Sequence, residues 1–191
     1  MSARNTIKHE GKFLTVYETE SGWEFVSRKQ FMNYREGNKK VDAVIIVPIL
    51  RGENGNHRIV ITNEWRQPLN THVWGFPAGL VDAGESGFDA AKRELKEETG
   101  LDCVKILHNT PRLFSSEGLT DECVSVIYVE ACGTISKDNL EANENIDCHI
   151  MDHGQAFHLL NDGEAYNFGK AVYFIMQDFV NTKFSWLMDK E

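Results

Sequence analysis

The sequence lacks the features that would place it in several specialised classes of protein. Its longest apolar stretch, residues 41–50, is too short to cross a membrane as a helix and contains Asp42 and Pro48. Residues 1–11 are polar and lack the apolar core of a signal peptide, so we expect no secretory signal. These absences predict a soluble protein of the cytoplasm with no membrane partner.

Cysteine and positive charge are also scarce. The four cysteines have spacings that match no metal-binding motif, and reduced thiols are their simplest interpretation; they are Cys103, Cys123, Cys132 and Cys148. Lys and Arg number 20 against 29 Asp and Glu, which gives a formal net charge of -9. An acidic surface repels phosphate backbones, so we expect no nucleic-acid partner. A small anionic substrate remains compatible with this charge, because a bound cation can reverse the local field.

What is present suits one well-buried domain with a small addition, because 191 residues with 41% hydrophobic content can form a substantial core. Residues 12–19 and 23–34 are rich in aromatic and β-branched residues and are separated by Ser21-Gly22, a pattern typical of an antiparallel hairpin. The polar residues 35–40 form a connector. We therefore expect an N-terminal β-hairpin element at residues 1–38 and a main domain at residues 39–191. His9 is expected to lie in a mobile terminus before the hairpin.

The main domain alternates strand-like and helix-like segments. Expected strands are residues 41–50, 58–63, 72–77, 103–113, 122–131 and 146–151, and expected helices are residues 87–99, 154–160 and 169–187. The last helix carries an apolar stripe, which is more typical of core than of a binding surface: Val172, Ile175, Met176, Phe179 and Val180. Mixed strands with helices on both faces predict an α/β fold in the form of an α/β/α sandwich.

The expected helix at residues 87–99 has clear ends and two kinds of face. Ser86 can cap its first turn, and Gly100 follows its last residue. Phe88, Ala91 and Leu95 lie on one stripe and are expected to pack against the sheet.

The other face of this helix carries the most informative residues of the chain. Glu94, Glu97 and Glu98 stand at positions i, i+3 and i+4, so their carboxylates project from one side and repel one another. A hard divalent cation such as magnesium would explain this arrangement, since it prefers carboxylate oxygens and shares its coordination with substrate phosphates. Arg93 can hold Glu97 through a two-bond contact. The alternative is an ordinary solvated acidic face.

Residues 79–101 resemble the Nudix box, G-x5-E-x7-R-E-U-x-E-E-x-G-U with U aliphatic, at every fixed position. The resemblance extends to segments typical of its nucleoside-diphosphate-sugar and ADP-ribose hydrolases. These segments are residues 77–80, residues 63–68 with Arg66, residues 143–146 and the two last helices. In that subfamily the N-terminal hairpin commonly exchanges across a dimer, so the resemblance implies a homodimer.

The resemblance implies a role for each matching residue. The carbonyl of Ala78 and the carboxylates of Glu94, Glu97 and Glu98 would hold magnesium, with manganese as a substitute. Arg93 and the three glutamates form the catalytic set, and Glu144 is the candidate for activating water, although the family also uses box glutamates as the base.

Substrate contacts are expected from Arg66, Gly79 and Trp23. Arg66 would contact a phosphate or the terminal sugar, with a surface ion pair as the alternative. Trp23 would stack on a base, as could Phe25 or Tyr34, although aromatic residues in strands are more often core. Glu85 is expected to support the loop before the helix or an outer shell of the metal.

The implied function is magnesium-dependent hydrolysis of the diphosphate bond of a nucleoside diphosphate sugar, giving a nucleoside monophosphate and a sugar phosphate. ADP-ribose and GDP-mannose are the foremost candidates. Glu117 stands where ADP-ribose hydrolases carry a proline, which weakens ADP-ribose in particular. The alternatives are sanitation of modified nucleoside triphosphates and a nucleotide-sensing module without turnover. RNA decapping is disfavoured by the acidic charge.

Overall fold

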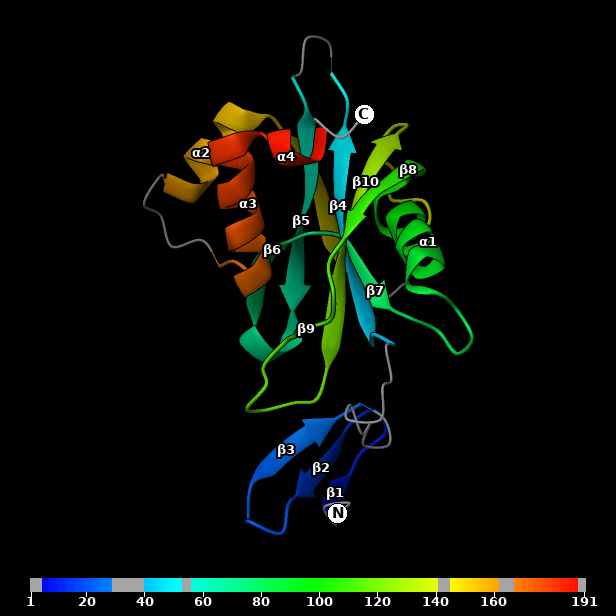
Figure 1. The fold of residues 1–191 in the computed structure, drawn as a ribbon, viewed down its shortest axis with the longest axis vertical. Coiled ribbons are helices and arrows are strands. Elements are labelled where there is room, and N and C mark those ends of the chain that lie inside the picture. The colour runs from blue at the N-terminus through cyan, green and yellow to red at the C-terminus, as the bar shows by residue number, and fades with distance from the viewer. Residues whose placement is uncertain (1–4, 29–39, 53–55, 141–144, 162–166, 189–191) are drawn as a thin grey trace.

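The computed structural model of this protein describes residues 5–28, 40–52, 56–140, 145–161 and 167–188 (Figure 1). A three-stranded antiparallel sheet, in the order β1-β2-β3, lies at one end of the molecule; its strands are β1 (Thr6–Glu10), β2 (Thr15–Glu18) and β3 (Glu24–Ser27). The rest of the described chain forms a larger mixed sheet with its helices. The small N-terminal antiparallel element expected from the sequence is therefore confirmed, with a third strand added.

The larger sheet has eight strands, and five of them follow the order β11-β5-β4-β10-β8. The shorter strands extend its edges: β6 pairs with β5, β7 with β4 and β9 with β10. The bounds are β4 (Ala43–Leu50), β5 (Arg58–Arg66), β6 (Thr71–Gly75), β7 (Ala78–Leu80), β8 (Asp102–Asn109), β9 (Leu113–Phe114), β10 (Cys123–Cys132) and β11 (Ile146–Met151). Only β4 and β10 run parallel, and every other pairing is antiparallel.

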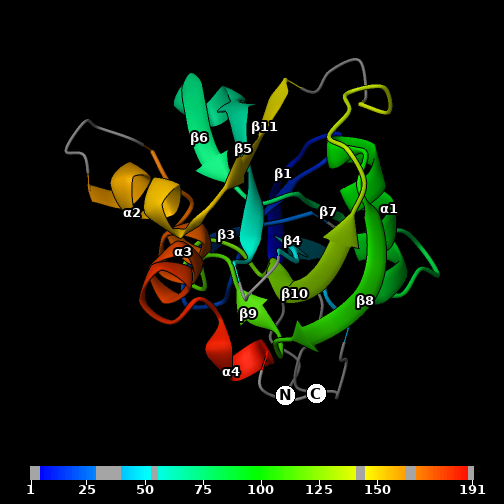
Figure 2. The same cartoon turned by 90° about the horizontal axis from the view of Figure 1, so that it is seen from above.

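Helices cover both faces of this sheet, as Figure 2 shows from above. The helix α1 (Gly87–Thr99) packs on one face, and α2 (His153–Asn161), α3 (Lys170–Thr182) and α4 (Ser185–Met188) lie on the other. Alternate residues of β4 feed two separate cores: Val44 and Ile46 point towards α1, and Val47 and Ile49 towards α3. This confirms the expected α/β/α sandwich.

The chemistry of its ends explains why α1 starts and stops where it does. The hydroxyl of Ser86 accepts a hydrogen bond from the backbone N–H of Asp89, which satisfies one of the unpaired donors of the first turn. Gly100 ends the helix in the left-handed region at φ 76°, and its N–H donates to the carbonyl of Lys96. Ala91 and Leu95 are buried against the sheet, as expected.

Two sequence-based expectations about element bounds are wrong, and a third falls partly outside the described residues. Residues 6–10 form strand β1, in which His9 pairs with Val16, whereas we expected a mobile terminus there. The strand expected at residues 103–113 ends at Asn109, because Thr110 bonds through its carbonyl and hydroxyl to β10 instead of continuing β8. Of the second hairpin segment, Glu24–Ser27 is strand and residues 29–34 lie outside the described residues.

The helix expected at residues 169–187 is in fact two helices. It breaks at Lys183 and Phe184, which both adopt the left-handed conformation with φ of 52° and 56°. The N–H of Lys183 donates to the carbonyl of Phe179, and the N–H of Phe184 donates to the hydroxyl of Thr182. These bonds turn the chain so that Phe184 is fully buried under α3. The predicted apolar stripe of α3 is core, as expected.

Two further expectations concern membranes and thiols. Within the described residues, no helix has the length and apolar character that a membrane crossing requires. All four cysteines are free, and Cys123 is fully buried.

Candidate active site

The strand β7 places the first residues of the site. It pairs antiparallel with β4, so that Ala78 lies opposite Ile45 and Gly79 opposite Val44. The carbonyl of Pro77 accepts from the N–H of Ile46, which extends this pairing by one residue. The backbone of residues 77–80 is therefore held by the sheet while α1 packs beside it.

Gly79 lies directly against the carboxylate of Glu94. A Cβ atom built on Gly79 would come within 1.9 Å of Oε1 and 2.0 Å of Cδ of Glu94, so the carboxylate would have to move to make room for it. Its φ does not lie in the left-handed region, so it is space and not backbone conformation that requires glycine here. The sequence alone did not explain why residue 79 is glycine, whereas the structure shows that a side chain there would displace the carboxylate of Glu94.

Glu98 is the most buried acidic residue at this site, with 5% of its surface exposed. Its Oε2 accepts a hydrogen bond of 3.2 Å from the N–H of Ala78. This contact joins the last turn of α1 to the start of β7. Burying a carboxylate costs free energy unless it has hydrogen-bond partners. The buried position of Glu98 therefore argues against the alternative of an ordinary solvated acidic face.

Arg93 connects α1 to the loop that precedes it. Its Nε and Nη2 donate to the two oxygens of Glu85 at 3.1 and 3.0 Å, and Nη2 also donates to the carbonyl of Leu80. Glu85 accepts in addition from the N–H of Asp82. The two-bond contact that we expected between Arg93 and Glu97 is wrong, because the guanidinium fork faces Glu85 and only Nη1 reaches Glu97, at 3.0 Å.

The Nη1 atom of Arg93 is shared between two of the three carboxylates, since it also donates to Glu94 at 2.6 Å. Glu94 is nearly enclosed, with 12% of its side chain exposed, whereas 42% of the Glu97 side chain is exposed. The structure thus brings together Ala78, Gly79, Arg93 and the three glutamates, as the sequence predicted. Hydrogen bonding, first to Glu85 and then to Glu94 and Glu97, raises the pKa of Arg93, which keeps its positive charge at every working pH.

The donor atoms at this site suit a hard divalent cation, because carboxylate and carbonyl oxygens are its preferred ligands. The close approach of Gly79 to Glu94 makes room for a backbone carbonyl and a carboxylate at one point. Among the residues that the structure describes, however, no three acidic, imidazole or thiol groups converge tightly enough to form a ready-made site. The donor types fit a cation, and the roles of the individual residues remain predictions.

A cleft opens beside β7 on the other face of the sheet; we call it the β7 cleft. It has a volume of about 400 Å³, and Ala78 lines it. Its walls are largely apolar and aromatic, with Trp74, Phe114 and Phe174 among them. Two positive side chains, Arg66 and Lys170, also line it. Lys170 opens α3, and no side chain caps the first turn of that helix.

The remaining predicted residues lie in different places. Arg66 lines the β7 cleft and pairs with Glu64 at 2.7 Å, so both interpretations of this arginine keep support. Trp23 is 60% exposed on the small sheet, where its Nε1 donates to the carbonyl of Gly118. Phe25 stacks on Tyr17, with ring centroids 5.4 Å apart. Glu144 and Tyr34 lie outside the described residues.

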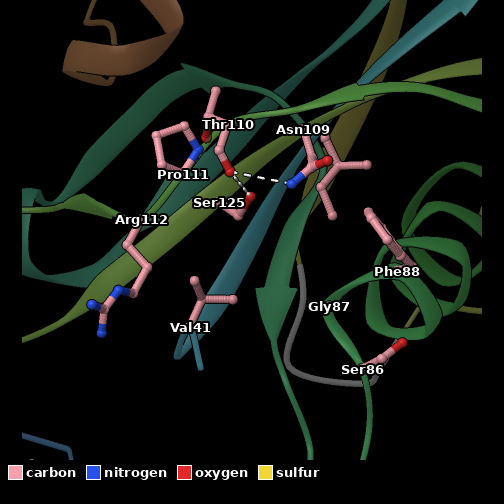
Figure 3. Close-up of a pocket in the computed structure, with 10 residues that line it drawn as sticks. Val41, Ser86, Gly87, Phe88, Asn109, Thr110, Pro111, Arg112 and Ser125 are labelled. Atoms are coloured by element: carbon pink, nitrogen blue, oxygen red, sulfur yellow. Dashed lines mark hydrogen bonds between the residues drawn. The ribbon is translucent and has the colours of Figure 1, made fainter. Parts of the chain in front are cut away.

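One expectation about α1 is wrong: Phe88 is 41% exposed and does not pack in the core. It lines a second cavity, of about 430 Å³, on the flank of α1 away from the β7 cleft (Figure 3). Ser125 and Asn109 both donate to the carbonyl of Thr110 in its wall. None of the three glutamates lines this cavity.

Sequence reasoning missed the residues that reach the site from far along the chain. Phe114, Lys170 and Phe174 lie in the β7 cleft only because the fold brings β9 and α3 beside β7. No spacing rule connects them with residues 79–101. The Arg93–Glu85 fork was missed for another reason, since the i, i+4 rule favours Glu97 and the path of the loop is not visible in the sequence.

We predict that Arg93→Lys weakens the fold, because lysine cannot make the fork to Glu85 and also reach Leu80. The free energy of unfolding should fall by about 1–2 kcal/mol, as measured by urea unfolding at pH 7. Arg51→Lys is the matched control, since Arg51 makes one exposed ion pair, with Glu130, and should lose less than about 0.5 kcal/mol.

The same variant should change the response to acid. The hydrogen bonds from Arg93 hold the pKa of Glu85 below its usual value. A lowered carboxyl pKa contributes stability that is present above the usual value, about 4.3, and is lost as the pH falls through the lowered one. Arg93→Lys should therefore lose less stability than the wild type below that pH. Equal losses in the two proteins would contradict the role given to Glu85.

Comparison with known proteins adds a family and several relatives. The model of the NUDIX domain matches residues 39–170. A putative nudix hydrolase 2 of Caenorhabditis elegans is 30% identical over 71% of this chain and 63% of its own length. An ADP-ribose pyrophosphatase of Saccharomyces cerevisiae is 36% identical over 59% and 51%, and an ADP-sugar pyrophosphatase of Mus musculus is 31% identical over 65% and 58%. This chain thus spans 51% to 63% of the length of these three relatives.

A solved structure supports the fold independently of close sequence likeness. The crystal structure of an ADP compounds hydrolase superposes with a TM-score of 0.59 and covers 95% of this chain and 94% of its own. Its sequence identity is 16%, so the likeness concerns the fold alone.

Proposed function

Because this chain belongs to the NUDIX family, we propose that it hydrolyses the diphosphate bond of a nucleoside diphosphate sugar, with ADP-ribose and GDP-mannose as the foremost substrates. Water attacks one phosphorus of the P–O–P bridge, the bond from that phosphorus to the bridging oxygen breaks, and this oxygen leaves with the other phosphate, so the products are a nucleoside monophosphate and a sugar phosphate. The names of the yeast and mouse relatives, an ADP-ribose and an ADP-sugar pyrophosphatase, support this substrate class.

One observation carries the proposal: Ala78 belongs both to the carboxylate site and to the β7 cleft. A substrate lying in the cleft therefore reaches the glutamates of α1 at this residue. The aromatic walls suit a planar base or the apolar face of a sugar. Arg66 and Lys170 suit the negative diphosphate, because both are positive at neutral pH.

We assign the cation site to the carbonyl of Ala78 and to Glu94, Glu97 and Glu98, with magnesium as the ion and manganese as its substitute. A bound divalent cation neutralises the diphosphate and makes water more acidic, which is the chemistry that this hydrolysis needs. Arg93 holds Glu94 and Glu97 and keeps the preceding loop in place. Glu144 is the proposed base on sequence grounds. Trp23 is the proposed stacking partner for the nucleobase of the substrate.

We also propose that the chain consists of two units, a small element at residues 1–38 and a main domain at residues 39–191. We propose further that the protein forms a homodimer. Large apolar side chains are exposed on the small sheet and its turns, among them Ile7, Phe13 and Trp23. A second copy of the chain would cover them. A cytoplasmic location is in keeping with four free thiols, since a reducing compartment preserves them.

A magnesium-containing panel of nucleotide sugars, dinucleotides and nucleoside triphosphates tests the function, with the products identified by mass. We expect ADP-ribose to give AMP and ribose 5-phosphate, or GDP-mannose to give GMP and mannose 1-phosphate. Release of pyrophosphate from triphosphates alone would indicate sanitation instead. Binding without turnover across the whole panel would indicate a nucleotide-sensing module.

A further inference from the structure

A polar cavity lies at the end of the molecule where β4 turns into β5, and it takes no part in the site described above. It has a volume of about 520 Å³, and its walls include His57, Arg58, Asp152, His153 and Lys183. In Figure 1 the last residues of β4, the first residues of β5 and α4 lie towards the same end of the sheet. Arg58 starts β5 and Arg66 ends it, so the two are about 26 Å apart along the strand at 3.3 Å per residue.

The cavity concentrates positive charge in a chain with a net charge of -9. Arg58 and Lys183 both line it, and neither forms an ion pair or hydrogen bond through its side chain within the part of the chain that the structure describes. Arg51, in contrast, forms an ion pair with Glu130. The cavity thus holds two positive side chains, Arg58 and Lys183, against one carboxylate, that of Asp152.

The other groups in the wall offset only part of this positive charge. The carboxylate of Asp152 accepts at 2.8 Å from the N–H of Gln155, so it caps the first turn of α2. Burial and then the charge of Arg51 lower the pKa of His57, which is therefore neutral and can hydrogen-bond a ligand at pH 7. His153 contacts the carbonyl of Val180 through Nε2. Asp152 is the one carboxylate among the lining residues.

The backbone at Lys183 is unusual for the residue it carries. Lys183 and Phe184 are consecutive non-glycine residues with positive φ, a conformation that is unfavourable for residues with a Cβ atom. Glycine or asparagine is the usual residue at such a helix end. A lysine at this point costs stability, and its side chain lies at the cavity that Arg58 also lines. Binding of a ligand by the ammonium group of Lys183 would explain why a lysine, and not a glycine, occupies this left-handed position.

We propose that this cavity is a binding site for a phosphate monoester, remote from the site of hydrolysis. Arg58 provides a fork of donors for phosphate oxygens, and Lys183 provides a second charge. The volume exceeds what a phosphate group alone needs and falls in the range of small-molecule sites, so a nucleoside or sugar can remain attached to the phosphate. The site stands independently of the proposed reaction.

Phosphate binding by the full-length protein, in EDTA and without turnover, tests this site. The probes are inorganic phosphate and AMP, followed by calorimetry and by the ring resonances of His57 and His153 in NMR. EDTA removes divalent cations, so the negative charges of the α1 glutamates are not neutralised. These charges then repel the anionic probes from the adjoining β7 cleft. We expect saturable binding of AMP that shifts both histidines. Equal affinities for the two probes would mean that only the phosphate is recognised, which still supports the site.

Two variants and one matched control decide the location. Lys183→Gly should melt at a temperature no lower than the wild type, because glycine accepts the left-handed conformation, and yet bind AMP about 10- to 100-fold more weakly. Arg58→Gln should weaken binding to a similar degree. Arg66→Gln removes the same charge at the other end of β5 and should leave this binding unchanged.

Three results would overturn the proposal. The first is the absence of saturable binding in the wild type. The second is unchanged affinity in Lys183→Gly, which would make this residue a helix end and nothing more. The third is loss of binding in Arg66→Gln alone, which would place the anion in the β7 cleft.

Discussion

Glu98→Gln is expected to lower turnover of the preferred substrate by about three orders of magnitude while leaving the fold intact. Glutamine keeps an oxygen that can accept from the N–H of Ala78, so the contact between α1 and β7 survives. It removes the negative charge, however, and with it several kcal/mol of attraction for a divalent cation and for the developing transition state. Steady-state kinetics with saturating magnesium measures the loss.

Binding of the cation itself gives a second measurement that does not depend on activity. Magnesium should raise the melting temperature of the wild type, because it binds the folded state, and should raise that of Glu98→Gln much less. Glu24→Gln is the matched control, since Glu24 is exposed on β3 and its loss should change neither quantity. Near-normal magnesium-dependent turnover in Glu98→Gln would remove Glu98 from the metal site.

Gly79→Ala is expected to reduce kcat/KM by about a hundredfold while the protein remains folded. The added methyl group would overlap the carboxylate of Glu94, whose end is flexible and can rotate away. The fold should therefore accept the change at a cost of about 1–2 kcal/mol, whereas Glu94 leaves the position that the site requires. Kinetics and thermal unfolding on the same preparation separate the two effects.

A double-mutant cycle tests whether Glu94 transmits this effect. In a Glu94→Ala background the methyl group meets no carboxylate, so Gly79→Ala should cost almost no stability there. Gly87→Ala serves as the control, because a Cβ at Gly87 would meet its nearest neighbour, in Val44, at an ordinary 3.6 Å. If Gly79→Ala lowers the free energy of unfolding by the same amount in the wild-type and Glu94→Ala backgrounds, the steric explanation is wrong.

Local patterns predicted much of the fold and most of the carboxylate site. Ser86 and Gly100 delimit α1 through interactions within a few residues, and the spacing of Glu94, Glu97 and Glu98 follows from helix geometry alone. The sandwich architecture followed from alternating strand and helix patterns. These features depend on neighbours in the sequence, which is why the sequence was enough to predict them.

The errors have a common physical origin in contacts that are distant in sequence. Phe88 has the spacing of a core residue, yet the fold leaves it in the cavity of Figure 3, since the strands facing it leave space there. The break at Lys183 carries neither glycine nor proline, so no local signal announces it. The β7 cleft joins β5, β6, β7, β9 and α3, and which residues meet there depends on how the sheet is assembled.

The small N-terminal sheet is attached to the main domain at a segment close to the β7 cleft. Four contacts connect it to residues 118–122: Val26 N–H to Leu119, Trp23 to Gly118, Ser27 to Asp121 and Arg28 to Glu122. That segment follows Ser115, which lines the β7 cleft. We therefore expect the small sheet and the main domain to unfold together, although the sequence shows a boundary between them. Removing the N-terminal strands would leave the residues that match the NUDIX model in place but would remove these contacts to the segment beside the cleft. We therefore expect residues 39–170 alone to have a less firmly held cleft wall.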